Sequence, residues 1–376
     1  MSHNVAKDGP YFTSGSISFS QLASTFGGSA SNIKASDYIR NTNVSETNPR
    51  VPDATENSQI ASSSSAGSNW RLSQFRNSIK TYYVTQSGTD INASVTGTPN
   101  WNSNLNKNIK KFYYLTGTAG SNSTSVALSA SGTVYNLRME VTGSILGYGG
   151  RGGGTSGAPA IDGEEGGTAL SMGTSGSTVA IVVGGGGRIY GGGGGGEKGK
   201  TGDTGASGSC AYNQTFQGGC GCPGCPGGWQ DLGCYQNYGS HCGRRQTCNG
   251  WGNCWWESNG DSRRNECKYT YSRAGGAGGA GGNGGPGRGY NNQSGSLSGS
   301  AGSPGGAAET CTLGGSYVTT PTAGKDGETG ASGGEWGNAG GNTANSGNGG
   351  AAGRAITGGN YSISGSTGSS NIKGSF

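Results

Sequence analysis

Cysteine is the residue type with the clearest chemical signature in this chain of 376 residues. Nine of its ten cysteines fall within 58 residues, and Cys311 lies alone downstream. This density is typical of disulfide-tied domains, and an even total allows complete pairing. We therefore predict disulfides, with Cys311 joined to one of the nine, although spacing alone does not give the pairing. The predicted disulfide residues are Cys210, Cys220, Cys222, Cys225, Cys234, Cys242, Cys248, Cys254, Cys267 and Cys311.

Zinc is the main alternative for these residues, and free thiols are a third. Cys220-x-Cys222-x2-Cys225 is a compact thiolate group, and a cytoplasmic product would be kept reduced. However, no second Cys-x2-Cys pair follows, and His241 is the single histidine nearby. Disulfides are the preferred interpretation, and we predict neither a metal nor a cofactor.

Aromatic and arginine residues share the cysteine-rich window, which holds four of the seven tryptophans. These residue types dominate binding hot spots because rigid aromatic side chains bury a large area at small entropic cost. Aromatic rings also stack on sugars. The alternative is that they fill the interior of a small disulfide-tied knob. The predicted binding residues are Trp229, Tyr235, Tyr238, His241, Arg244, Arg245, Trp251, Trp255 and Trp256.

One stretch matches the sequence pattern of a nucleotide-binding motif but lacks the structural context that the motif requires. Residues 194–201 satisfy the phosphate-loop pattern GxxxxGK[ST]. That chemistry needs a helix directly after the loop, so that backbone amides and the helix N-terminus converge on the phosphates. The glycine-rich residues 202–208 are a poor helix, and 196–208 are better described as collagen-like Gly-x-y triplets. We do not predict nucleotide binding.

Catalytic groups are scarce. His3 and His241 are the only histidines, and no G-x-S-x-G elbow follows a strand. Asp162, Glu164 and Glu165 form the densest carboxylate group and could serve as a glycosidase pair. Ion binding or solubility explains them better in a glycine run. We predict that the chain is not an enzyme.

Glycine is distributed unevenly along the chain, whose elements must position these residues. Of 83 glycines, 10 lie in residues 1–142 and 73 in residues 143–376, about 31% of that second part. Collagen would need far more than the 10 prolines present. Glycine runs with a three-residue period favour polyproline II helices, whose bare backbones can approach and hydrogen-bond to one another. A flexible linker is the alternative.

A six-residue pattern recurs three times near the N-terminus, at 17–22, 33–38 and 70–75. In each copy an apolar residue precedes a serine by three positions, which suits a brief strand and then a serine-capped helical turn. Chance similarity in a serine-rich chain is the alternative. After the third copy of this pattern, aromatic and β-branched runs with near period-two alternation predict short strands.

The predicted fold is therefore mainly β and irregular, in five parts. We expect a small α/β docking module over residues 1–75 and an antiparallel β unit over 76–147. A glycine-rich polyproline II bundle follows in two parts, 148–208 and 274–376. The Cys/Trp-rich insertion, 209–273, interrupts it. Loops on rigid scaffolds are where recognition residues concentrate.

Charge and targeting signals narrow the function classes. The net charge of +5, with 12% charged residues, is too dilute for a surface that tracks phosphates, so we do not predict nucleic-acid binding. No apolar run approaches the length of a membrane span, and residues 1–10 hold no apolar stretch of signal-peptide length. We expect synthesis in the cytoplasm, then release by cell lysis and oxidation outside.

Two parts of the chain resemble virion proteins of tailed bacteriophages. Residues 9–11 and 17–22 together with 35–42 are similar to the start of tail-associated proteins, particularly of marine cyanophages, over about residues 9–85. Residues 166–170 and 188–196 resemble glycine-rich distal tail-fibre and receptor-binding tip proteins, over about 147–376. That family stacks polyproline II helices and presents loops to the host surface. The long Cys/Trp insertion departs from its short loops, which leaves the receptor-contacting loop open.

The resemblance implies a virion structural protein of the phage tail, at a distal fibre or receptor-binding tip. Its implied partners are other tail or fibre proteins through residues 1–75, and a host-surface glycan or membrane protein through the loops. A homotrimer and a monomeric cap are both open. The alternatives are an architectural tail or baseplate component, a polysaccharide-degrading tailspike, and a glycine-rich adhesive or ice-binding protein.

Overall fold

The chain forms two compact units that are mostly β with little helix. Unit 1 comprises Met1–Gly199, Gly282–Ala301 and Thr329–Phe376, and unit 2 comprises Lys200–Gly281 and Gly302–Glu328. The described residues hold no helix with the length and apolar character that crossing a membrane requires. The computed structural model describes residues 11–26, 38, 51, 57, 59–60, 71–78, 80–95, 110–218, 224–236, 244–248, 251, 254–258, 263–312 and 314–376.

Unit 1 begins with a short amphipathic helix, α1 (Phe19–Phe26). A reciprocal cap starts it, because Gln21 N–H donates to Ser18 Oγ (3.2 Å) and Ser18 N–H donates to Gln21 Oε1 (2.7 Å). The cap is therefore Ser18, which precedes the predicted Ser20. Ile17 lies in no strand, so the brief strand predicted before the helical turn is not formed there.

The same cap position recurs in the third copy of the six-residue pattern. There η3 (Leu72–Phe75) is a 3-10 turn, and Arg71 N–H donates to Gln74 Oε1 (3.1 Å) as Ser18 does to Gln21. The sixth residues of the three copies also share one property, complete burial in a single apolar cluster. They are Leu22, Tyr38 and Phe75. The repeat therefore has a common structural role.

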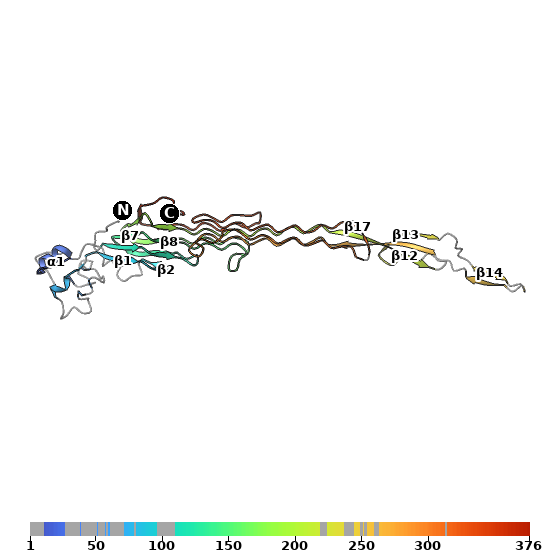
Figure 1. Cartoon of the computed structure of the whole chain (residues 1–376), viewed down its shortest axis with the longest axis horizontal. Coiled ribbons are helices and arrows are strands. Elements are labelled where there is room, and N and C mark those ends of the chain that lie inside the picture. Colours follow the sequence, from blue (N-terminus) through green and yellow to red (C-terminus); the bar gives the residue numbers. More distant parts are fainter. Residues whose placement is uncertain are drawn as a thin grey trace. The chain divides into compact units, whose positions relative to one another are not determined.

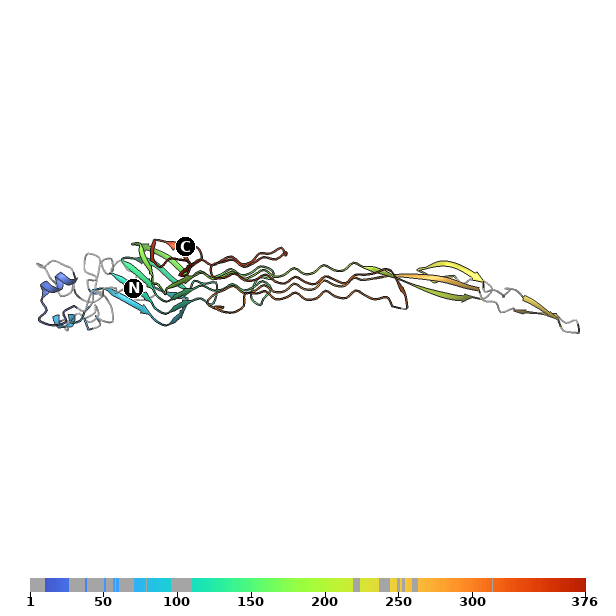
Figure 2. The ribbon, with the colours of Figure 1, turned by 45° about the horizontal axis from the view of Figure 1, so that its top comes forward.

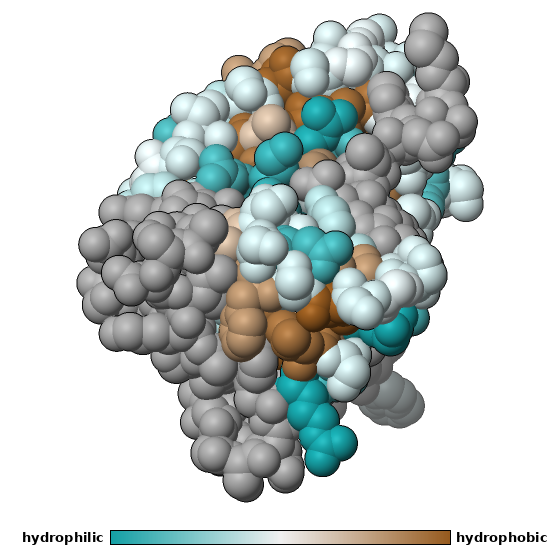
Figure 3. Space-filling model, turned by 90° about the vertical axis from the view of Figure 1, so that its left-hand side faces the viewer, coloured by the Kyte–Doolittle hydropathy of each residue, from teal (hydrophilic) through white to brown (hydrophobic). Residues whose placement is uncertain are grey.

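Aromatic rings build much of this cluster. Phe26 and Phe75 meet edge to face with ring centroids 5.9 Å apart, an arrangement that the ring quadrupoles favour. Seen from the side on which α1 lies in Figure 1, apolar residues also reach the described surface in patches between hydrophilic ones (Figure 3). The N-terminal part of unit 1 thus has a small core of its own.

Parallel strands form the next part of unit 1 (Figures 1 and 2). The chain visits three parallel sheets in rotation, so that each strand pairs with the strand one turn later. The result is a three-sided parallel β-solenoid. The first sheet contains β1 (Tyr82–Gln86), β4 (Lys111–Leu115), β7 (Leu137–Val141), β10 (Val179–Val183) and β19 (Tyr361–Gly365); the second contains β2 (Thr89–Ile91), β5 (Thr118–Gly120), β8 (Ser144–Leu146), β11 (Arg188–Tyr190) and β20 (Ile372–Lys373); the third contains β3 (Ala93–Ser94), β6 (Leu128–Val134), β9 (Leu170–Gly176) and β18 (Ile356–Gly359).

The strand register stacks apolar residues inside the solenoid. In the first sheet Tyr113, Met139 and Ile181 occupy matched positions of β4, β7 and β10, and all three are buried. Because side chains alternate across a strand, one set of each strand fills the core and the other faces outward. This core explains why alternate positions of the strands are mostly apolar.

The predicted β unit of residues 76–147 has the expected strands, but its antiparallel pairing is wrong. The described strand pairs of this region are parallel. Two-residue corners that end in Gly88, Gly117 and Gly143 turn the chain into the next sheet instead of back along the same one. A Cβ on Gly143 would lie 1.9 Å from the carbonyl oxygen of Gly117, so the stacked corners require glycine.

Two glycine-rich excursions leave the solenoid, at 147–169 between β8 and β9 and at 191–355 between β11 and β18. Their parts in unit 1 hydrogen-bond to one another through the backbone, and each donor series advances by three residues. Successive residues therefore face different neighbours. Gly193, Gly196 and Gly199 donate to Arg288, Gly285 and Gly282; Gly192 and Gly195 donate to Gly167 and Glu164; and Gly194 donates to Asn338.

Bare backbones are required where these segments meet. A Cβ on Gly194 would lie 1.8 Å from the carbonyl oxygen of Gly350, and a Cβ on Gly152 would lie 1.8 Å from that of Gly284. Real Cβ atoms do not approach so closely, and the flexible-linker alternative does not account for such packing. The polyproline II conformation of these segments stays a prediction.

Unit 2 is built from antiparallel strands. Its main sheet has the order β13 (Trp229–Gln236), β16 (Arg263–Arg273), β12 (Gly208–Gly218) and β17 (Ser316–Thr319). A separate hairpin consists of β14 (Arg244–Cys248) and β15 (Cys254–Ser258). The three-residue pattern also occurs inside this unit, where Gly202 and Gly205 donate to Gly279 and Gly276.

The solenoid includes strands on both sides of the boundary expected at 147/148. Its strands β9 to β11 lie in the range predicted as the first glycine-rich part, and β18 to β20 lie in the range predicted as the second. The insertion 209–273 falls within unit 2. Because the excursions separate neighbouring turns of the solenoid in sequence, the sequence pattern alone does not show that these turns are adjacent.

Candidate functional site

The cysteine-rich insertion is organised by β12 and β16, which pair along their full length from Gly208–Arg273 to Gly218–Arg263. Two disulfides fasten this pair. Cys210 of β12 is bonded to Cys311, and Cys267 of β16 is bonded to Cys225 in the loop before β13. Both strand cysteines are fully buried. The disulfides thus join β12 to the segment that contains Cys311, and β16 to the loop before β13.

Two of the predicted bridges are therefore present, and Cys311 does pair with a cysteine of the insertion. Cys254 is disulfide-bonded as well. A bridged Cys225 has no thiolate to offer, so the zinc alternative lacks one of its three proposed ligands. The remaining predicted cysteines have side chains outside the described residues: Cys220, Cys222, Cys234, Cys242 and Cys248.

Trp229 lies in a cluster of half-buried rings on one face of the main sheet. Three rings have centroids within 6 Å of its own: Tyr269 at 5.2 Å, Phe216 at 5.6 Å and Tyr212 at 5.9 Å. The series continues from Tyr269 to Tyr271 (5.7 Å), and the Arg273 guanidinium lies 4.7 Å from the Tyr271 ring centroid. Trp229 thus has the surroundings that the knob-filling alternative expects.

Trp251 is much more exposed than Trp229. It lies in the turn between β14 and β15, and 91% of its surface is exposed. The register of this hairpin places Arg245 opposite Glu257 and Thr247 opposite Trp255. The other predicted binding residues lie on described strands whose side chains are not described, or outside the described residues altogether. The first group is Tyr235, Arg244, Arg245, Trp255 and Trp256, and the second is Tyr238 and His241.

Unit 2 also exposes apolar residues that the sequence analysis did not select. Leu232 on β13 is 43% exposed, and Tyr317 and Val318 on β17 are 44% and 53% exposed. Both strands lie at the edges of the main sheet. The signal that could have found β17 is its aromatic and β-branched run, but four residues are too few to stand out from a loop.

The first six residues of the phosphate-loop match, 194–199, belong to the packed glycine segments of unit 1, and the last two belong to unit 2. The N–H groups of Gly195, Gly196 and Gly199 donate to Glu164, Gly285 and Gly282, and those of Gly194, Glu197 and Lys198 donate to Asn338, Gly341 and Ile161. A phosphate site needs several amides that converge on one anion. Here the amides point to different neighbouring segments, so the motif arises from composition.

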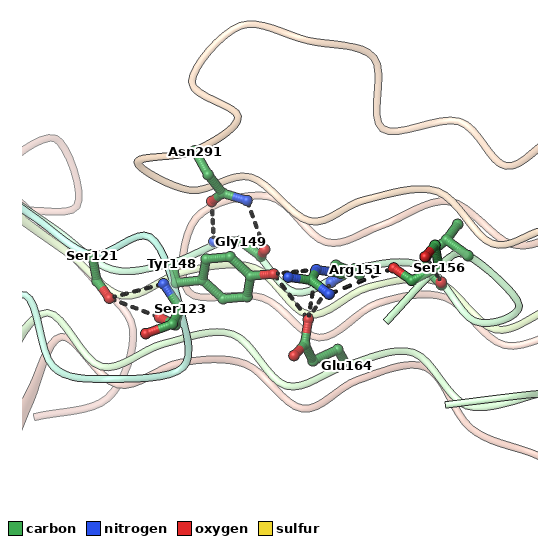
Figure 4. Close-up of polar contacts among 10 residues, drawn as sticks. Ser121, Ser123, Tyr148, Gly149, Arg151, Ser156, Glu164 and Asn291 are labelled. Atoms are coloured by element: carbon green, nitrogen blue, oxygen red, sulfur yellow. Dashed lines mark hydrogen bonds and ion pairs between the residues drawn. The ribbon is translucent and has the colours of Figure 1, made fainter. Parts of the chain in front are cut away.

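Two of the three clustered carboxylates, Asp162 and Glu164, make hydrogen bonds within the same scaffold, and those of Glu164 are drawn in Figure 4. Tyr148 Oη–H donates to Glu164 Oε2 (3.0 Å), the Arg151 backbone N–H donates to the same oxygen (3.1 Å), and Arg151 Nε–H donates to Tyr148 Oη (3.0 Å). Burial and then the hydrogen bond to Glu164 raise the pKa of Tyr148. Asp162 Oδ1 accepts the Asn348 N–H (2.8 Å). Both carboxylates therefore hold chain segments together.

Asn291 provides a similar link near that cluster (Figure 4). Gly149 N–H donates to Asn291 Oδ1 (2.7 Å), and Asn291 Nδ2–H donates to the Gly149 carbonyl oxygen (3.2 Å). The side-chain amide thus pairs with both backbone groups of one residue, as a neighbouring strand would. Polar side chains in this scaffold therefore complete the backbone hydrogen-bond network.

Comparison with known proteins does not identify a family for this chain. No family model matches the chain, and no curated protein matches it. Among solved structures, the gp37–gp38 adhesin tip complex of the bacteriophage S16 long tail fibre is similar at 14% sequence identity and a TM-score of 0.22, over 82% of this chain and 88% of that one. A TM-score this low does not establish a shared fold, and no function follows from it.

Proposed function

We propose that this chain is a structural protein of a phage tail, at a distal fibre or receptor-binding tip, that attaches through residues 1–75 and binds the host surface through unit 2. The proposed role is binding, without a catalytic step. The observation that carries it is the exposure of Trp251 at the turn of the β14–β15 hairpin.

An exposed tryptophan at a loop tip favours a binding role. Its large apolar surface is mostly exposed to water here, whereas at an interface it would bury a large area with little loss of conformational entropy. Arg244 and Arg245 occupy the strand that leads into this turn, and arginine is also enriched at hot spots. A host-surface glycan or membrane protein is the proposed partner, since indole stacks on sugar rings and packs on apolar side chains.

The glycine-rich segments support the proposal as a rigid scaffold. Hydrogen-bond donors that advance by three residues fit a polyproline II helix, which has three residues per turn, and we propose that conformation for them. Such a scaffold needs no side-chain core, so the loops between its segments can vary freely. That property suits a protein that must follow a changing host surface.

The N-terminal part supports a docking role. It has its own apolar cluster, and apolar patches lie on the described surface on the side of α1 (Figure 3). Patches of this kind mark interaction sites in soluble proteins. We propose that other tail or fibre proteins bind there, which places the chain in the virion.

The test is binding of the purified full chain to outer envelopes isolated from a panel of cyanobacterial strains. On a strain that binds the unaltered chain, Trp251→Ala should weaken binding at least tenfold, because loss of a hot-spot side chain costs about 2 kcal/mol or more. Tyr317→Ala is the matched control, since it removes an exposed ring from the main sheet of unit 2. Unchanged binding of the Trp251 variant would reject the assignment of this turn.

The two other roles make different predictions. An architectural component would bury Trp251 against a neighbouring subunit, so that particle assembly would suffer while envelope binding stayed unchanged. A tailspike would release reducing sugar from host polysaccharide and lose that activity on Asp162→Asn or Glu165→Gln. The scaffold contact of Asp162 gives no support to the second role.

A further inference from the structure

Cysteines and apolar cores are distributed in opposite ways between the two units. All ten cysteines lie in unit 2, and unit 1 contains none. Both buried apolar clusters, that of the solenoid and that of the N-terminal part, belong to unit 1. The two units must therefore be stabilised by different means.

Unit 2 has almost no apolar interior. Among its residues whose burial the structure describes, the buried ones are glycines, Pro321, Asn265 and the two cysteines Cys210 and Cys267. Both cysteines are in disulfides. A sheet of four strands normally needs an apolar face or a second layer to be stable. In this unit the apolar face of the sheet consists of rings that are only half-buried, and the buried side chains at described strand positions are Asn265 and the two disulfide cysteines.

The contacts that remain around these bridges are polar and partly exposed. Segment 302–328 is joined to β12 by the Cys210–Cys311 bond and by the four-residue strand β17. It meets β16 through the Arg273–Glu309 ion pair (3.6 Å) and the Tyr271 Oη–H bond to the Thr312 carbonyl (2.6 Å), and backbone hydrogen bonds join it to segments 200–206 and 274–281. The Glu309 side chain is 54% exposed. Exposed ion pairs contribute little to stability. Loss of the Cys210–Cys311 bond would therefore leave this attachment to one short strand pair, backbone hydrogen bonds and polar side-chain contacts.

We propose that unit 2 folds only when its cysteines are oxidised, whereas unit 1 keeps its fold in the presence of reductant. In a reducing cytoplasm the chain would carry a finished unit 1 and an open unit 2. Each bridge forms by thiol–disulfide exchange with a low-molecular-weight disulfide such as oxidised glutathione. Two cysteine thiols lose two electrons and form one S–S bond, the small disulfide bond breaks, and its two halves leave as thiols with the two protons.

For the proposed function, this means that the binding turn is completed only after the chain meets an oxidising environment. That consequence rests on the proposed host-binding role, but the folding claim does not. Attachment through the cysteine-free unit 1 could proceed before oxidation. Assembly and host binding would then be separated by redox chemistry.

The experiment uses the full chain, oxidised or reduced with dithiothreitol under native conditions and then alkylated, with complete alkylation checked by mass. A short trypsin pulse follows, and peptides are quantified. Cleavage after Lys268 and Arg273 in unit 2 should rise at least tenfold on reduction, whereas cleavage after Arg138 and Arg188 in unit 1 should not change. Equal protection of unit 2 in the fully alkylated chain would overturn the proposal.

A cysteine variant tests the same proposal without reductant or alkylation. The full chain with Cys210, Cys225, Cys267 and Cys311 all changed to Ser should show the same selective cleavage of unit 2. Retained protection in that variant would also overturn the proposal. Trp251→Ala in the oxidised chain should leave the cleavage pattern unchanged, so failure of the redox proposal can be told apart from failure of the binding proposal.

Discussion

The rings of Tyr38 and Phe75 meet edge to face, with centroids 6.5 Å apart and an interplanar angle of 82°. They are the sixth residues of the second and third copies of the six-residue pattern. Leu22, the sixth residue of the first copy, is fully buried in the same cluster. The pattern is therefore a packing repeat, in which each copy contributes one large side chain to a shared core.

This relationship predicts a large effect of one truncation. Phe75→Ala should destabilise the N-terminal part of unit 1 by about 3–5 kcal/mol, because it removes a buried ring and leaves a cavity. Phe19→Ala should cost less than about 1 kcal/mol, since that ring is 39% exposed. Hydrogen exchange of the α1 amides in the full chain measures both effects. Equal effects would contradict the central place of Phe75.

The solenoid shows what the sequence could and could not predict. Alternation identified the strands near Val84, Leu115 and Val141, but the same alternation serves parallel and antiparallel pairing. The corner motif that distinguishes them was present as Ser-Gly-Thr, Thr-Gly-Thr and Thr-Gly-Ser after β1, β4 and β7. The strands at 356–373 could not be joined to it, because their partners precede the long second excursion and no local signal spans that distance.

The candidate site was also predicted only in part from the sequence. Composition identified the insertion and predicted a bond from it to Cys311, because clustered cysteines and an even total have a simple covalent interpretation. It did not separate Trp229, which has three ring neighbours, from Trp251, which is 91% exposed. Burial of one aromatic residue depends on which strands pair, and pairing is a tertiary property.

The glycine packing predicts a sharp contrast between two equal substitutions. Gly194→Ala should destabilise unit 1 by about 3 kcal/mol or more, since its Cβ would overlap the carbonyl oxygen of Gly350 at 1.8 Å. Gly185→Ala has open space around its Cβ and should change stability by less than about 1 kcal/mol. Thermal unfolding of the full chain compares them. A Gly194 variant as stable as the Gly185 variant would show that the segments are not packed as described.

Glu197 predicts a local effect on the loop that covers it. Its carboxylate is fully buried and accepts the N–H groups of Thr343 (2.5 Å) and Gly347 (2.9 Å). Glu197→Ala would leave these two half-buried N–H groups without this acceptor, at up to about 1–3 kcal/mol each. The exchange of both amides should therefore accelerate at least tenfold in the full chain. Glu165→Ala, at an exposed position, is the control, and unchanged protection of Thr343 would refute the role of Glu197.

Lys111 predicts a dependence of stability on pH. Its side chain is 1% exposed, its Nζ donates to the Tyr135 carbonyl oxygen (2.8 Å), and burial lowers its pKa from 10.5 to about 8. Between pH 8 and 9.5 the unfolded chain still binds this proton while the folded chain has released it. The free energy of unfolding should therefore rise with pH in this window, by up to about 2 kcal/mol.

Removing the amine should remove that rise. Lys111→Met keeps an unbranched apolar side chain beside Leu137, its partner in the register of β4 and β7, and should give a flat profile between pH 8 and 9.5. Lys110→Met, at an exposed position, should retain the rise. Urea unfolding of unit 1 at half-unit pH steps measures the three profiles. A rise of equal size in the Lys111 variant would assign it to another group and contradict the lowered pKa of this lysine.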